Sequence, residues 1–98
     1  MTYIFVNRPT IRRDILEAVH YYKKISPELA QLFLKRISEA KDSIALSPEG
    51  YQIRYKNVRI KMLQQFPYHI HYLINSEKQQ IIILAILHAY KRPKEYID

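Results

Sequence analysis

The spacing of apolar residues divides the chain into a strand, two helices and a series of further strands. Residues 2–7 (TYIFVN) are rich in β-branched and aromatic side chains, which is typical of a strand. From Thr10 the apolar residues recur every three or four positions, which indicates an amphipathic helix. Ser26 then offers a helix N-cap, and Pro27 suits the first helical position. A second helix is therefore predicted from Pro27 to Leu46.

After the turn sequence SPEG (47–50), which holds the only glycine, the pattern changes to strict alternation. Apolar and polar residues alternate on both sides of Asn57, which predicts two strands joined by a tight turn, because asparagine tolerates a positive φ. FPYHIHYLIN (66–75) alternates in the same way. IIILAIL (81–87) is apolar at every position, which indicates a central strand.

This order predicts one α+β domain that covers residues 1–98. An N-terminal strand, an antiparallel helix hairpin and three to four mostly antiparallel strands would form one twisted sheet with both helices on one face. The first strand is expected at an edge or beside the last strand, because the helix hairpin separates it from the strands that follow.

Composition narrows the classes of partner. The net charge is +7 and the pI is about 9.7, which suits an anionic partner, although a basic surface also serves simple solubility. The absence of cysteine excludes disulfides and thiolate metal sites. No stretch resembles a signal peptide or is long enough to span a bilayer, so we expect a cytoplasmic protein with no membrane partner.

Two histidines on one predicted strand form the first candidate site. His69 and His71 are two positions apart and would point to the same face. That spacing suits a metal, but no cysteine or acidic residue nearby completes a ligand set. We interpret both as ordinary strand residues and expect neither a metal nor a cofactor.

Basic residues of the predicted hairpin form the second candidate. Their alternation with apolar residues predicts a single solvent-facing patch that binds the target or its phosphate groups. The alternative is a solvated outer face whose charges discourage aggregation. The patch consists of Arg54, Lys56, Arg59 and Lys61.

The C-terminal sequence HAYKRPKEYID is the third candidate. Histidine is suited to proton transfer near neutral pH, the cations suit a phosphate, and tyrosine can stack on a base. The alternative is a basic tail in which the histidine packs at the end of a strand. The residues concerned are His88, Tyr90, Lys91, Arg92, Lys94 and Tyr96. Deletion from Tyr90 onward is expected to abolish function and leave a folded protein.

Taken together, these segments resemble the RelE/ParE superfamily of toxins from type II toxin–antitoxin systems, and lie closer to its ParE-like or plasmid-stabilisation branch. The features that carry the resemblance are the helix pair followed by basic strands, FPYHIHY (66–72), IIILAILH (81–88) and the KRP..Y ending (91–96). The resemblance spans essentially the whole chain. It implies a growth-inhibiting toxin that a cognate antitoxin neutralises, and it leaves open whether the toxin forms a homodimer or only a hetero-oligomer with that antitoxin.

The resemblance also implies two classes of target. ParE-like members inhibit DNA gyrase by binding, whereas RelE-like members cut messenger RNA in the ribosome. Many relatives carry a basic pair before FPY where this chain has Gln64 and Gln65, which favours the gyrase-directed interpretation. If the protein is an endoribonuclease, the resemblance places catalysis at His88, Arg92 and Tyr96. A basic binding domain without toxicity is the third interpretation.

Overall fold

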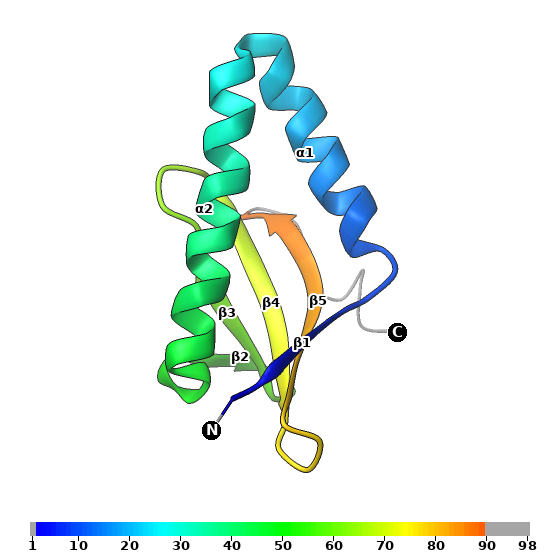
Figure 1. The fold of residues 1–98 in the computed structure, drawn as a ribbon, viewed down its shortest axis with the longest axis vertical. Helices are drawn as coiled ribbons and strands as arrows, with labels where there is room; N and C mark the ends of the chain where they lie inside the picture. The colour runs from blue at the N-terminus through cyan, green and yellow to red at the C-terminus, as the bar shows by residue number, and fades with distance from the viewer. Residues whose placement is uncertain (1, 90–98) are drawn as a thin grey trace.

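The computed structural model describes residues 2–89 of the chain. In this range a short strand leads into two helices, a 3₁₀ turn and four further strands (Figure 1). The elements are β1 (Ile4–Asn7), α1 (Ile11–Ile25), α2 (Pro27–Leu46), η1 (Pro48–Gly50), β2 (Ile53–Tyr55), β3 (Val58–Met62), β4 (Tyr68–Asn75) and β5 (Gln80–His88). The predicted α+β order is confirmed. No helix among the described residues is sufficiently long and apolar to cross a lipid bilayer.

Ser26 ends the first helix and caps the second. Its backbone N–H donates to the carbonyl of Tyr22 at 2.9 Å, and its hydroxyl accepts a hydrogen bond from the N–H of Leu29 at 3.3 Å. Pro27 takes the first helical position, where a missing N–H costs nothing. The predicted bounds of the second helix, Pro27 and Leu46, are confirmed. The two helices form an antiparallel hairpin on one side of the sheet (Figure 1).

The five strands lie in the order β1-β5-β4-β3-β2. β1 runs parallel to β5, with Val6 opposite Ile82, and the other neighbouring strands are antiparallel. β1 therefore lies both at an edge and beside the last strand. β5 has a neighbour on each side, as its uninterrupted apolar sequence predicted.

The turn between β2 and β3 has the expected backbone conformation. Lys56 has φ 43° and Asn57 has φ 75°. Positive φ at both central residues is the type I′ geometry that suits a two-residue hairpin, because its twist matches that of the flanking strands. The tight turn predicted at Asn57 is confirmed.

The core lies between the helix hairpin and the sheet, and Phe33 of α2 is its centre. This ring is fully buried and lies 5.4 Å from the ring of Tyr22, 5.2 Å from Phe66 and 5.1 Å from Tyr68, measured between centroids. The pairs with Phe66 and Tyr68 are edge to face, whereas the pair with Tyr22 is tilted at 33°. Edge-to-face pairs contribute roughly 0.5–1.5 kcal/mol each beyond the area that they bury. The aromatic cluster therefore fixes the hairpin over the start of β4.

At the other end of α2, a hydrogen bond joins η1 to the sheet. The Tyr72 hydroxyl donates to the carbonyl oxygen of Pro48 at 2.6 Å. Burial raises the pKa of Tyr72 to about 12, so the phenol remains a neutral donor near pH 7. This contact joins η1 to β4.

Candidate functional site

Two of the four basic hairpin residues lie on the side of the sheet that the helices cover. On β4, Arg59 is opposite Tyr72 and Lys61 is opposite Ile70. Ile70 is fully buried beneath helices α1 and α2. The Arg59 guanidinium donates to the carbonyl oxygen of Tyr51 at 2.6 Å and to that of Glu49 at 3.1 Å. Arg59 therefore stabilises the η1 segment.

Lys61 is also engaged on that side. Its Nζ lies 5.0 Å from the centroid of the Tyr51 ring, a cation–π distance. Together with Arg36, Glu39 and Ser43 of α2, Lys61 borders an open cleft of about 350 Å³ between α2 and β3.

The other two basic residues lie elsewhere. The pairing of β2 with β3 shifts register between Ile53 and Tyr55, and this irregularity breaks the alternation of faces. Arg54 is exposed, close enough to His69 for its charge to lower the pKa of that imidazole. Lys56 is in the turn. The prediction that Arg54, Lys56, Arg59 and Lys61 share one solvent-facing patch is therefore wrong, and their role in target binding stays a prediction.

His69 and His71 share the face of the sheet without helices, as predicted, with ring centroids 6.2 Å apart. His71 is only 3% exposed, and its Nδ1 is 2.8 Å from the hydroxyl of Tyr55. Burial lowers the pKa of His71 to about 4, with a smaller contribution from His69. The ring is therefore neutral near pH 7 and contributes to packing rather than to charge.

His88 ends β5 directly opposite the first residue of β4, Tyr68. The two rings meet edge to face at 5.4 Å. Asp14 and Glu17 of α1 join these residues around a cavity of about 50 Å³. Burial lowers the pKa of His69, and the charges of Arg54 and His88 lower it further.

Five predicted site residues lie outside residues 2–89. They are Tyr90, Lys91, Arg92, Lys94 and Tyr96. Their roles in target binding and catalysis stay predictions. Within residues 2–89, no group of three or more histidine, aspartate or glutamate side chains is arranged to hold a metal ion.

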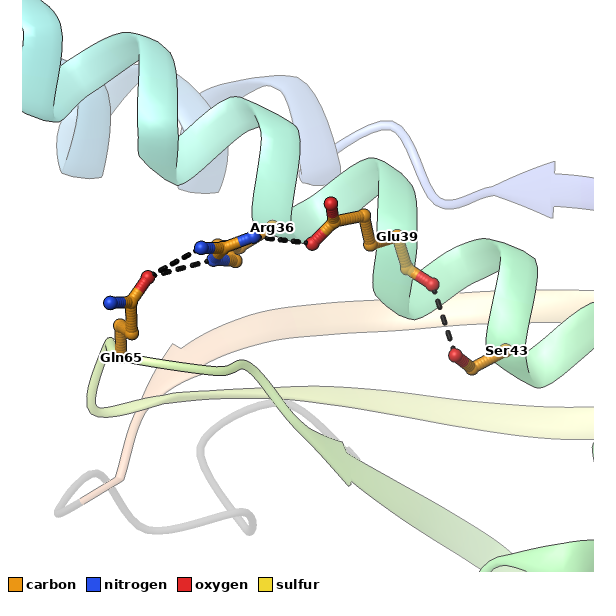
Figure 2. A network of polar contacts seen from close by, with 4 residues as sticks. All are labelled: Arg36, Glu39, Ser43 and Gln65. Atoms are coloured by element: carbon orange, nitrogen blue, oxygen red, sulfur yellow. Dashed lines mark hydrogen bonds and ion pairs between the residues drawn. The ribbon is translucent and has the colours of Figure 1, made fainter.

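Arg36 of α2 makes a contact that the sequence did not reveal (Figure 2). Its Nε and one Nη donate to the side-chain oxygen of Gln65 at 2.9 and 2.6 Å, and its other Nη pairs with Glu39 at 2.7 Å. Gln65 has φ 69°, in the loop between β3 and β4. Arg36 thus places a cation beside the Gln64–Gln65 pair and joins α2 to this loop.

Comparison of the sequence with models of known protein families identifies the family of this chain. Residues 7–93 match the model of the ParE toxin of type II toxin–antitoxin systems, parDE. The chain belongs to the ParE toxin family. It is therefore the toxin component of a type II toxin–antitoxin system, as its resemblance to the RelE/ParE superfamily implied.

Solved structures share the fold of this ParE-family toxin at low sequence identity. A chain of the chromosomal ParDE system from P. aeruginosa superposes with a TM-score of 0.74 at 20% identity, covering 89% of this chain and 96% of that one. The RelBE2 toxin–antitoxin complex from Mycobacterium tuberculosis gives 0.55 at 18% identity, with coverages of 90% and 99%. A mutant of E. coli RelE in the free state gives 0.56 at 18% identity, with coverages of 92% and 86%. No curated protein matches the sequence significantly.

Proposed function

We propose that this ParE-family toxin inhibits DNA gyrase in the cytoplasm by binding to it, and that a cognate antitoxin neutralises it. The family match supports the gyrase-directed interpretation. The net charge of +7 suits both partners, since complementary charge accelerates the encounter of two proteins.

The observation that carries this proposal is the separation of Arg59 and Lys56 from His88. His88 is opposite Tyr68, whereas Arg59 is opposite Tyr72, four positions further along β4. At roughly 3.4 Å per residue, this distance is about 14 Å, and the turn that holds Lys56 lies beyond Arg59. A nuclease needs its proton donor and phosphate-binding cations around one phosphate group. The basic residues of β2, β3 and the turn between them are spread along the sheet instead, which suits contacts over a protein surface.

A ribosome-dependent endoribonuclease is the second candidate, and one observation favours it. Arg54 and His88 both influence the pKa of His69 at the same end of the sheet. In such an enzyme, His88 would take the proton of the ribose 2′-OH, whose oxygen would attack the adjacent phosphorus. The bond to the 5′-oxygen of the next nucleotide would break, leaving a 2′,3′-cyclic phosphate, and that oxygen would take a proton from water while Arg54 offsets the phosphate charge. Arg92 and Tyr96 would complete the site.

Induced expression followed by two separate readouts distinguishes the candidates. A gyrase inhibitor relaxes a reporter plasmid before protein synthesis falls, whereas an endoribonuclease stops protein synthesis and cleaves transcripts while supercoiling is unchanged. Co-expression of the antitoxin is the control that reverses either effect. Unchanged growth, supercoiling and protein synthesis would contradict both candidates.

A further inference from the structure

A β-bulge in β5 places two consecutive side chains on the face of the sheet without helices. The register between β4 and β5 shifts so that Leu84 has no residue opposite it on β4, whereas Ile83 and Ala85 both do. Ile83 and Ile86 pack in the core beneath the helices, so Leu84 and Ala85 between them both face the other way. Bulges are common beside binding sites, because they redirect a side chain.

A groove of about 330 Å³ lies over this bulge, and we call it the open-face groove. Val58 and Ala85 form its apolar floor. They are only 3% and 1% exposed, although neither belongs to the core between the helices and the sheet. Leu73 and Leu84 are half-buried and also line the groove. This volume and a mostly apolar lining are typical of sites for small molecules, which occupy roughly 300–1,000 Å³.

The charged residues that line the open-face groove are all basic. Arg8 follows β1, and Lys56 lies with Asn57 in the turn between β2 and β3. The described residues that line the groove include no carboxylate. A guanidinium has five N–H donors, so Arg8 can bind an anion in addition to its other contacts. The groove therefore combines an apolar floor with cations from two separate segments.

Tyr55 gives the open-face groove a fixed wall next to the turn. Its hydroxyl lies 2.8 Å from Nδ1 of His71, and the two ring centroids are 5.8 Å apart. Because His71 is buried in the sheet, this contact holds the phenol ring in place directly before Lys56. A wall that is already ordered reduces the entropy that a ligand loses on binding.

We propose that the open-face groove binds a small molecule with a flat apolar body and one carboxylate. The body would cover Leu73 and Leu84, and the carboxylate would accept hydrogen bonds from Arg8 and Lys56. A neutral ligand would forgo these charge-assisted bonds, and a small anion without the apolar body would leave the floor in contact with water. This inference goes beyond the proposed function, since the groove includes neither His88 nor Arg54.

Three matched probes test the proposal on the full-length protein. They are naphthylacetate, which has both features, its primary amide, which lacks the charge, and acetate, which lacks the body. NMR shifts of the methyl groups of Val58, Leu73 and Leu84 report binding in the open-face groove. We expect naphthylacetate to bind roughly tenfold or more tightly than the amide, and acetate to leave these methyl signals unchanged at the same concentrations.

Matched variants locate the site. Lys56→Gln removes one cation from an exposed turn, and Leu84→Trp fills part of the open-face groove. Lys24→Gln makes the same change of charge at an exposed residue in the last turn of α1. We expect Lys56→Gln and Leu84→Trp to weaken the binding of naphthylacetate by about tenfold, and Lys24→Gln by less than about twofold. Melting curves confirm that each variant is folded.

Three results would overturn the proposal. They are equal binding of naphthylacetate and its amide, shifts confined to methyl groups outside the open-face groove, and equal weakening by Lys56→Gln and Lys24→Gln. None of these measurements involves gyrase or mRNA, so their failure is distinct from failure of the proposed function.

Discussion

The carboxylate of Asp14 on α1 accepts a hydrogen bond from the backbone N–H of Ile86 on β5 at 3.1 Å. β1 pairs with β5 only as far as Ile83, to whose carbonyl the Arg8 N–H donates, and the chain then turns into α1. The N–H of Ile86 lies beyond the reach of β1, and Asp14 supplies the acceptor that the missing strand would have given. This contact fixes α1 over the end of β5 beside His88.

Loss of the Asp14 carboxylate is expected to destabilise the fold. Asp14→Ala leaves the N–H of Ile86 without this acceptor, which costs about 1–3 kcal/mol in the free energy of unfolding. Urea denaturation measures the change. Glu17→Ala, one turn later and exposed, is the control and should cost less than about 0.5 kcal/mol. Equal losses in the two variants would contradict a specific role for Asp14.

The Tyr72 hydroxyl is expected to stabilise the η1 segment. Tyr72→Phe removes the donor to the Pro48 carbonyl in a buried position and should lower the free energy of unfolding by about 1–2 kcal/mol. The matched control is Tyr21→Phe, since Tyr21 is 58% exposed and its change should be close to neutral. Thermal denaturation of both variants tests the difference, and an equal change in Tm would contradict it.

Substitutions of Arg59 and Arg54 are expected to differ in their effects on stability and on toxicity. Arg59→Met breaks two hydrogen bonds to backbone carbonyls, so we expect a loss of about 1–3 kcal/mol in stability, with toxicity falling as a consequence. Arg54→Met alters an exposed cation and should lower toxicity at unchanged stability. Melting curves and growth assays of both variants give the comparison. A stable Arg59→Met protein with no toxicity would instead assign Arg59 to the target interface.

Local signals were sufficient to predict most of the fold. Ser26 and Pro27 determine the start of α2 through a cap and a fixed φ, and Asn57 determines the turn through its tolerance of positive φ. The start of α2 and the turn at Asn57 are both determined by residues that are adjacent in the sequence. The central position of β5 followed from its uninterrupted apolar run, because only a strand covered on both sides favours that pattern.

The candidate site was harder to predict, because it depends on irregularities and long-range contacts. A single register shift in β2 separates Arg54 from Arg59, and strict alternation gives no warning of such a shift. The contacts of Arg36 with Gln65 and of Asp14 with Ile86 join residues far apart in sequence. Nothing in the local pattern distinguishes these polar residues from other solvated ones.

Acid is expected to destabilise the protein through His71. Burial holds its pKa at about 4 in the folded state, below the ordinary value of 6.5, so the unfolded chain binds the proton first as pH falls. Neutral His71 makes its full contribution to the free energy of unfolding above about pH 6.5, and this contribution is lost between pH 6.5 and 4. The free energy of unfolding then falls by at most about 1.4 kcal/mol per pH unit.

Urea denaturation from pH 7.5 to 4 tests this dependence. His71→Gln removes the titrating group and should flatten the slope between pH 6.5 and 4. A slope of the same size in the His71→Gln variant would show that other groups cause the acid sensitivity.

His88→Ala is expected to separate the two proposed activities. An endoribonuclease that uses His88 for proton transfer should lose roughly a hundredfold or more in rate. A gyrase inhibitor should lose only the binding free energy of one contact, which is about 1 kcal/mol. We expect the smaller loss, measured as the concentration that inhibits gyrase by half, with thermal stability as the control. Complete loss of toxicity at unchanged stability would favour the nuclease.

The most direct test of the central claim is supercoiling by purified gyrase in the presence of increasing concentrations of the full-length toxin. We expect more of the plasmid to stay relaxed as the toxin concentration rises, an equimolar amount of antitoxin to restore supercoiling, and ribosome-bound mRNA to be left intact by the same preparation. Full gyrase activity at every toxin concentration, together with cleavage of that mRNA, would contradict inhibition of gyrase by this toxin.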